Sequence, residues 1–175
     1  MNVCLIGNGI ATLILATILA NKNIKVVIFE ETYQKKTNLE TRTLGVSKYN
    51  FDYLKKEKIN IEEKSWPINK IKIYNENNKK ILNFRSERNK ILFIIKNREL
   101  TYVLNKIVKK NKLIKINKIV GDSFFNSIIK EKNNYDLIIN FNEKNKISKE
   151  IFFKREEKNY ESTAFTTLIN HKKMK

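Results

Sequence analysis

The sequence predicts an α/β fold built on a parallel sheet, and three features near its N-terminus support this prediction. An apolar run at residues 3–6 is followed by a Gly-Asn-Gly turn at 7–9. A second apolar run at 10–20 carries no charged residue, and a third at 25–29 ends in Glu30. This order indicates a buried strand, a tight turn, a buried helix and a second buried strand.

The turn has the composition of a phosphate site. Two of the chain's four glycines lie in it. Glycine permits tight turns and close approach of the backbone to a ligand, and the N-terminus of the following helix presents unpaired N–H groups to an anion. We therefore predict that the phosphates of a dinucleotide bind to the turn and the first turn of the helix, at Gly7, Asn8, Gly9, Ile10 and Ala11.

Glu30 stands about 20 positions after the first glycine, where a dinucleotide fold places the acid that binds a ribose hydroxyl. One position departs from the Gly-x-Gly-x-x-Gly pattern, because Thr12 occupies the third glycine position. That glycine lets helix and strand pack closely. A small Thr weakens the motif without removing it.

The alternative interpretation of the uncharged run at 3–20 is a membrane span or a signal sequence. No Lys or Arg precedes the run, as a secretory signal would require. The glycine turn leaves a helix at 10–20 of about 16 Å, whereas a bilayer core is about 30 Å thick. The sequence therefore favours a helix buried inside an α/β domain.

The net charge of +18 would ordinarily suggest a nucleic acid or an acidic surface as partner. The lysines, however, are scattered between Asn and Ile along the chain instead of forming one stripe. We therefore expect solvated surface lysines and no specific nucleic-acid partner. The single Cys allows no intrachain disulfide and favours a reducing, cytoplasmic location. The single His, His171, lies near the end of the chain, so we expect neither a His-based triad nor a metal cluster.

After Glu30 the polar segment at 31–41 has no periodicity and is expected to be a long loop. Ser47 can cap a helix over 48–58, with Phe51 and Leu54 facing inward.

The only Trp and the only Pro, at 66–67, are taken as a break before a new kind of structure. Alternating apolar residues at 71–74 and 82–84, around an Asn-rich turn, predict a hairpin. A further strand is predicted at 91–95.

The segment at 97–110 has the clearest helical period in the chain, with apolar residues at i, i+3, i+4, i+7 and i+8 and lysines at its C-terminal end. Beyond it, strands are predicted at 113–116, 119–120, 123–129, 135–141 and 162–170.

The Gly-Asn-Gly turn, the Val-Val-Ile-Phe-Glu strand and an Arg-x-x-small-aliphatic-Ser element at 42–47 together resemble the aromatic-ring hydroxylases that use FAD. They are most similar to the hydroxylases of ubiquinone biosynthesis, relatives of p-hydroxybenzoate hydroxylase. The resemblance implies a Rossmann-like FAD/NAD(P)-binding fold with a parallel sheet, plus part of an antiparallel substrate-side sheet. It implies an FAD-binding domain at 1–65 and 96–145, and a partial substrate-side domain at 66–95 and 146–175.

The same resemblance implies two further cofactor contacts. The Arg of the family's element falls on Arg42, where the alternative is a solvated loop cation. The polar first residue of the family's matching helix, which faces the FAD, falls on Asn97, where the alternative is a plain helix N-cap. The family's Asp-Gly after the strand at 135–141 falls on residues 142–143, which are Asn and Glu here. That segment helps to bind FAD and NAD(P)H in the family, so the difference weakens the expectation of NAD(P)H.

The function implied is oxygen insertion into an aromatic ring with FAD as cofactor and NAD(P)H as reductant. The substrate would be a small aromatic or prenylated phenol, and the protein would associate peripherally with the inner membrane. The family runs to roughly twice this length and carries a C-terminal Gly-Asp motif that the sequence lacks. The alternative is therefore a truncated or degenerate nucleotide-binding protein without catalysis. No residue is nominated as a general acid or base.

Overall fold

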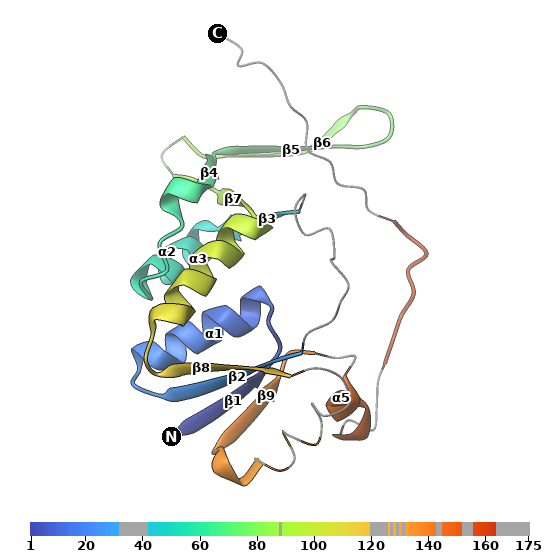
Figure 1. Ribbon diagram of the computed structural model, residues 1–175. Coiled ribbons are helices and arrows are strands. Elements are labelled where there is room, and N and C mark those ends of the chain that lie inside the picture. The colour runs from blue at the N-terminus through green and yellow to red at the C-terminus, as the bar shows by residue number, and fades with distance from the viewer. Residues whose placement is uncertain are drawn as a thin grey trace. The chain divides into compact units, whose positions relative to one another are not determined.

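The computed structural model describes residues 1–31, 42–87, 89–119, 126, 128, 130, 132–142, 145–151 and 156–163. Contacts divide the chain into two compact units: Met1–Thr41 with Lys112–Lys175, and Arg42–Asn111. Figure 1 shows the elements of both. The domain boundaries implied by the resemblance stay a prediction.

The first unit is built on a four-stranded sheet in the order β8-β2-β1-β9 (Figure 1). The central strand β1 (Asn2–Ile6) pairs in parallel with β2 (Lys25–Glu31) on one side and with β9 (Leu137–Asn140) on the other. Strand β8 (Ile114–Ile119) pairs in parallel with β2. The predicted α/β fold built on a parallel sheet is confirmed. Strand β8 is continuous where two short strands were expected.

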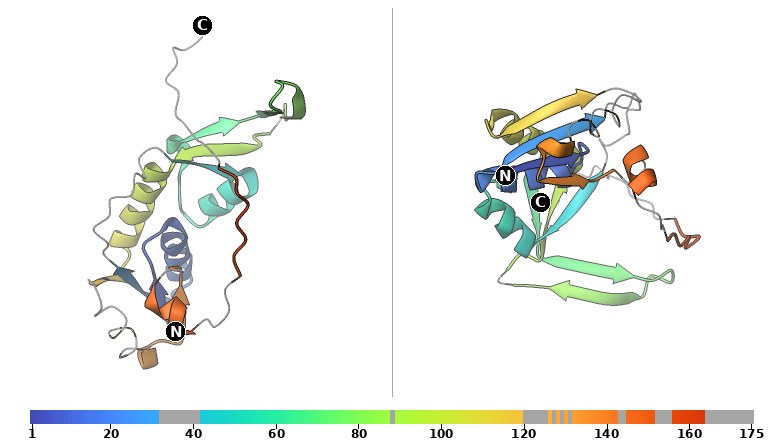
Figure 2. Two further views of the ribbon diagram at one scale, coloured as in Figure 1. Left: turned by 90° about the vertical axis from the view of Figure 1, so that its right-hand side faces the viewer. Right: turned by 90° about the horizontal axis from the view of Figure 1, so that it is seen from below.

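Helix α1 (Ile10–Asn21) covers one face of this sheet (Figures 1 and 2). Its buried residues are small or aliphatic, which lets the helix lie close to the strands; they are Thr12, Leu13, Ala16, Thr17 and Ala20. A separate buried cluster on strands β1 and β2 joins Cys4, Ile6 and Phe29 to Ile128 and Ile147. Because side chains alternate along a strand, this cluster lies on the face opposite α1.

Three elements at the end of the first unit differ from the prediction. Residues 126, 128 and 130 are helical, so the strand expected at 123–129 is wrong where the structure describes it. Its apolar pairs at 124–125 and 128–129 recur at i and i+4, and a short apolar run does not separate helix from strand. A short helix, α5 (Lys146–Ile151), follows β9, and a 3-10 turn, η3 (Lys132–Asn134), precedes it.

The second unit contains a three-stranded antiparallel sheet in the order β3-β7-β4. Its strands are β3 (Thr43–Ser47), β7 (Leu92–Lys96) and β4 (Ser65–Ile68). Helices α2 (Lys48–Lys56) and α3 (Asn97–Lys110) follow β3 and β7, and a 3-10 turn, η2 (Glu62–Lys64), precedes β4.

The core of the second unit follows the predicted pattern. The backbone N–H of Asn50 donates to Ser47 Oγ at 3.2 Å, so Ser47 caps α2 as expected. Phe51 stacks on Phe93 with ring centroids 3.8 Å apart. The core also buries Leu54, Ile59, Ile61, Ile95, Leu100, Leu104 and Val108.

Trp66 and Pro67 do not mark a break, because both lie within strand β4. They pair with Ile94 and Phe93 of β7. Strand β4 is an edge strand, and an edge is where a sheet tolerates a proline that cannot donate to a second neighbour.

The predicted hairpin is confirmed as β5 (Lys70–Tyr74) and β6 (Lys80–Arg85). The side-chain oxygen of Asn75 accepts hydrogen bonds from the backbone N–H groups of Asn77 and Lys79, which fixes the Asn-rich turn.

The remaining predictions are tested only in part. Glu31 belongs to β2, and the rest of the loop expected at 31–41 lies outside the described residues. So does most of the strand expected at 162–170, of which residues 162–163 are in neither helix nor strand. None of the helices in the described ranges has the length and hydropathy needed to cross a bilayer.

Candidate dinucleotide site

The glycine turn between β1 and α1 has a conformation that requires glycine at its first position. Gly7 has φ +129°, a region that side-chain-bearing residues rarely adopt. A Cβ added to Gly7 would lie 3.2 Å from Thr12 Oγ1 and 3.3 Å from Phe141 Cβ. The protein's own packing therefore selects glycine here.

Gly9 is different, because nothing lies within 4 Å of a Cβ added to it. It has φ −76° and ψ 171°, values open to any residue. The fold itself therefore does not require glycine at this position. An open space beside a backbone at a helix N-terminus is what a pyrophosphate needs for close approach.

Gly9 is also the N-cap of α1, and no side chain caps that end. The first intrahelical hydrogen bond runs from the N–H of Leu13 to the carbonyl of Gly9 at 3.1 Å. The N–H groups of the first helical turn, those of Ile10 and Ala11 among them, have no intrahelical acceptor. With no acidic residue in that turn, the positive end of the helix dipole is left for an anion.

Glu30 lies near the end of β2, with its carboxylate next to the glycine turn. The side-chain amide of Asn8 donates a hydrogen bond to Glu30, with 3.1 Å between Nδ2 and Oε1. Lys118 Nζ is 4.0 Å from the other carboxylate oxygen, and the Glu30 side chain is 27% exposed. The carboxylate is thus positioned by the protein and still open to hydroxyl donors from solvent.

The glycine turn is tied to both strands that flank β1. The N–H of Gly7 donates to the carbonyl of Phe29 at 2.9 Å, and the N–H of Phe141 donates to the carbonyl of Ile6 at 2.9 Å. The chain passes from β1 to β2 and β8 on one side and returns with β9 on the other. The turn therefore lies at the point where strand order reverses, and open α/β sheets bind ligands outside the carboxyl ends of strands there.

A group of polar side chains at and after β9 was not predicted from the sequence. Asn140 Nδ2 donates to Ser148 Oγ at 2.8 Å and to Asn145 Oδ1 at 3.1 Å. Asn145 also accepts from the N–H of Ser148 at 2.9 Å, which caps helix α5, and Ser148 Oγ donates to the carbonyl of Asn142 at 2.8 Å. The available signal for this cap was Asn145, a typical N-cap residue, two positions before the apolar Ile147. The group fixes the chain that follows β9, next to the glycine turn.

Arg42 and Asn97 both belong to the second unit. The N–H of Asn97 donates to the carbonyl of Arg42 at 2.9 Å, so the structure brings these two residues together. The N-cap of α3 is Lys96, which rules out a plain N-cap role for Asn97. Within the described part of the chain, Asn97 Oδ1 is buried without a hydrogen-bond partner. Arg42 is exposed. Cofactor contact by either residue stays a prediction.

Thr12 is fully buried, as expected for the position where helix and strand pack. Its Oγ1 is a second buried oxygen without a partner among the described residues. In contrast, Thr17 on the same helix donates from Oγ1 to the carbonyl of Leu13 at 2.8 Å. The packing of α1 thus accommodates the side chain of Thr12 at the third glycine position, but the described residues provide no hydrogen-bond partner for its hydroxyl.

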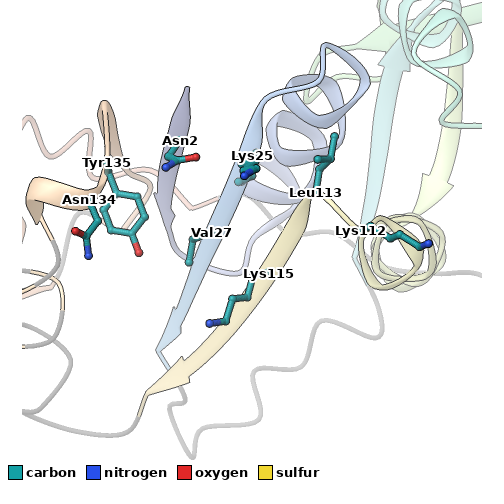
Figure 3. A pocket seen from close by; sticks show the side chains of 9 residues that line it. Asn2, Lys25, Val27, Lys112, Leu113, Lys115, Asn134 and Tyr135 are labelled. Atoms are coloured by element: carbon teal, nitrogen blue, oxygen red, sulfur yellow. The ribbon is translucent and has the colours of Figure 1, made fainter.

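A hollow of about 330 Å³ lies at the N-terminal ends of the strands, at the end of the parallel sheet opposite the glycine turn (Figure 3). Asn2 and Lys25 line it from the starts of β1 and β2, and Tyr135 approaches from the segment before β9. The strands begin at this end of the sheet, and no helix N-terminus is among the described residues that line the hollow. It contains none of the residues predicted to bind the cofactor.

Comparison with solved structures identifies the same architecture in monooxygenases. The p-nitrophenol 4-monooxygenase PnpA from Pseudomonas putida DLL-E4 matches with a TM-score of 0.53 at 15% identity, over 66% of this chain and 31% of its own. PqsL from Pseudomonas aeruginosa, a probable FAD-dependent monooxygenase, matches with a TM-score of 0.55 at 14% identity, over 67% of this chain and 32% of its own.

A protein from Photorhabdus luminescens subsp. laumondii TTO1, assigned as an FAD-containing monooxygenase, has a TM-score of 0.50 and 26% identity, over 67% of this chain and 30% of its own. No protein-family model matches the sequence, and no curated protein matches it. The chain spans about a third of the length of the solved structures it matches. It therefore shares its fold with one part of FAD-dependent monooxygenases.

Proposed function

We propose that the chain binds FAD through its ADP half, at the glycine turn and Glu30. The observation that carries the proposal is the pairing of an open Gly9 with a Glu30 carboxylate held beside the same turn by Asn8. Both features favour ligand binding, and neither is needed to stabilise the fold. Packing does not require glycine at position 9, and Glu30 keeps a partly exposed carboxylate near the C-terminal end of its strand.

In this proposal each residue has a separate task. Gly7 shapes the turn, while Gly9, Ile10 and Ala11 present backbone N–H groups to the pyrophosphate. Glu30 accepts hydrogen bonds from the ribose diol. The side chain of Asn8 holds that carboxylate in place, so its contribution to binding is positional.

Arg42 and Asn97 are proposed to contact the cofactor as well. The buried Oδ1 of Asn97 without a partner among the described residues supports this role, because an unsatisfied buried acceptor is costly unless a donor reaches it. FAD, when bound, would supply the redox and oxygen chemistry, and the protein would supply binding and orientation.

The finer proposal is a hydroxylase of the ubiquinone-biosynthesis type, with NAD(P)H as reductant and a small aromatic or prenylated phenol as substrate. The sequence elements at 7–9, 26–30 and 42–47 support it, together with the fold shared with FAD-dependent monooxygenases. The test is to purify the protein, record its flavin absorbance and measure NAD(P)H-dependent hydroxylation of simple and prenylated phenols. Flavin-dependent product formation supports the proposal. NAD(P)H oxidation without hydroxylated product from any phenol would contradict it.

A second candidate function is nucleotide binding without catalysis. Two observations favour it: the Thr12 hydroxyl at a motif position has no partner among the described residues, and Asn142 stands where the resembled family has Asp. Titration of ADP and FAD beside that assay separates the candidates, because a non-catalytic binder would bind ADP and FAD with similar affinity and give no product.

A further inference from the structure

Phe141 follows β9 directly and lies beside the glycine turn. Its N–H donates to the carbonyl of Ile6 at 2.9 Å, which continues the parallel pairing of β9 with β1 by one position. A Cβ added to Gly7 would lie 3.3 Å from Phe141 Cβ and 3.2 Å from Thr12 Oγ1 of helix α1. The side chain of Phe141 therefore starts on the α1 side of the sheet, close to the first turn of that helix.

The ring of Phe141 is not part of the core. Its side chain is 40% exposed, whereas the only other phenylalanine in the described part of the first unit, Phe29, is 1% exposed. A single exposed aromatic residue is common on protein surfaces. Phe141 is distinguished by its place at the carboxyl ends of the parallel strands, where an open α/β sheet binds its ligand.

The backbone is anchored on both sides of Phe141. Asn140 Nδ2 donates to Ser148 Oγ at 2.8 Å and to Asn145 Oδ1 at 3.1 Å. The N–H of Asn142 donates to Asn140 Oδ1 at 3.0 Å, and its carbonyl accepts from Ser148 Oγ at 2.8 Å. Phe141 is therefore carried by a fixed segment, and a surface that is already ordered loses less entropy when a ligand binds to it.

The order of the strands gives the direction in which a dinucleotide extends. Glu30 at the end of β2 is the proposed ribose contact, and the turn after β1 is the proposed pyrophosphate site. Strand β9 lies on the other side of β1 (Figure 1). Dinucleotides bind across the crevice at such a reversal of strand order. The half of the ligand beyond the pyrophosphate therefore extends toward the end of β9, where Phe141 lies.

We propose that Phe141 is a specificity-determining residue that contacts the flavin ring of FAD and so distinguishes FAD from ADP. The flavin half is what FAD has and ADP lacks, and its ring system is flat and largely apolar. An aromatic side chain offers such a ring both apolar burial and favourable stacking. A ribityl chain or a phosphate is polar and gains little from a phenyl ring.

This inference rests on the proposed function and extends it. The proposed function assigns residues to the ADP half of FAD, and Phe141 is assigned here to the other half. Because ADP and FAD are titrated separately, a failure of the ADP site and a failure of the Phe141 contact give different results.

The experiment is titration of ADP and FAD into the full chain as wild type, F141L and F141A. F141L keeps an apolar side chain and removes the flat ring, whereas F141A removes most of the apolar surface as well. The matched controls are F84L and F84A, at a phenylalanine of the second unit that is 49% exposed. Circular dichroism checks that each variant folds.

We expect F141A to weaken FAD binding about tenfold, the upper range for one aromatic contact, and to leave ADP binding unchanged. F141L should show a smaller loss for FAD and none for ADP. The two Phe84 variants should bind both nucleotides as the wild type does. Loss confined to FAD is the result that a merely structural role for Phe141 would not give.

A direct readout of contact does not depend on the affinity of a truncated variant. Trp66 is the only tryptophan, so F141W in a W66F background places the only indole beside the turn. An indole in contact with a flavin quenches the flavin's emission by electron transfer. The emission lifetime of bound FAD should therefore be shorter in W66F/F141W than in W66F. An unchanged lifetime would contradict the proposal.

The remaining outcomes also decide the question. Equal FAD affinity in wild type and F141A, with ADP still bound, would overturn this inference and leave the proposed function intact. Equal losses of ADP and FAD in both Phe141 variants would overturn it too, because Phe141 would then act by shaping the turn. No binding of either nucleotide by the folded wild type would overturn the proposed function and this inference with it.

Discussion

Asn8 and Glu30 are 22 positions apart in the chain, and the side-chain amide of Asn8 donates to the carboxylate of Glu30 with 3.1 Å between Nδ2 and Oε1. The bond joins the glycine turn to the end of the second strand. It fixes one carboxylate oxygen and leaves the other to a weaker contact, 4.0 Å from Lys118. The glycine turn and the end of β2 are therefore linked by the protein itself.

Replacing Glu30 by Ala should weaken binding of ADP by about 1.5–3 kcal/mol, the usual contribution of hydrogen bonds to a charged group. The measurement is isothermal titration of ADP into wild type and variant. Glu63→Ala, an exposed acid in η2 of the second unit, is the matched control for the loss of one negative charge. Unchanged affinity in Glu30→Ala would reduce Glu30 to a solvated strand end.

Replacing Asn8 by Ala should weaken ADP binding by about 0.5–1.5 kcal/mol, because it removes a neutral donor that only positions the carboxylate. In the double variant with Glu30→Ala, the Asn8 change should cost almost nothing further. Additive losses in this double-mutant cycle would show that Asn8 acts on the ligand by itself.

The two glycines of the turn should respond in opposite ways. Gly7→Ala should lower the free energy of unfolding by about 1–3 kcal/mol, because its positive φ and two close neighbours leave no room for a methyl group. Gly9→Ala should change stability by less than about 1 kcal/mol and yet weaken ADP binding at least tenfold. Denaturant unfolding and ADP titration of both variants test the contrast. Tight ADP binding by a folded Gly9→Ala protein would exclude close phosphate approach at this position.

Thr12→Val should stabilise the protein by about 1 kcal/mol, because it removes a buried hydroxyl without a partner among the described residues. Thr17→Val is the control on the same helix. Thr17 is also buried, but its hydroxyl donates to Leu13, so removing it should be neutral or destabilising. Urea midpoints for both variants give the comparison. A loss of stability in Thr12→Val would reveal a partner for its hydroxyl.

Much of this fold could be predicted from local pattern. The apolar runs at 3–6, 10–20 and 25–29 are bounded by glycines or charged residues. The near absence of polar residues at 10–20 predicts a helix that is buried on nearly every side. The helix at 97–110 followed from its period. These elements are specified by their own sequence.

The predictions that failed depended on neighbours that a local pattern does not contain. Pro67 looked like a break because proline cannot donate in a sheet, and only the edge position of β4 makes it acceptable. The apolar run at 123–129 was too short to separate helix from strand.

The sequence predicted the kind of ligand for the candidate site but not the side-chain contacts within it. The spacing between Gly7 and Glu30 indicated a dinucleotide motif. However, the contacts of Asn8 with Glu30 and of Asn140 with Asn145 are side-chain geometries, which spacing alone does not give. Asn97 was predicted as a cofactor contact or an N-cap, and only the backbone of α3 excludes the second.

The most direct test of this account is titration of ADP and FAD into the purified chain, with Gly9→Ala and Glu30→Ala measured alongside. We expect both nucleotides to bind at one shared site, each displacing the other, and both substitutions to weaken this binding while the protein stays folded. If the folded wild-type chain shows no saturable binding of either ADP or FAD, the dinucleotide site proposed at Gly9 and Glu30 is wrong.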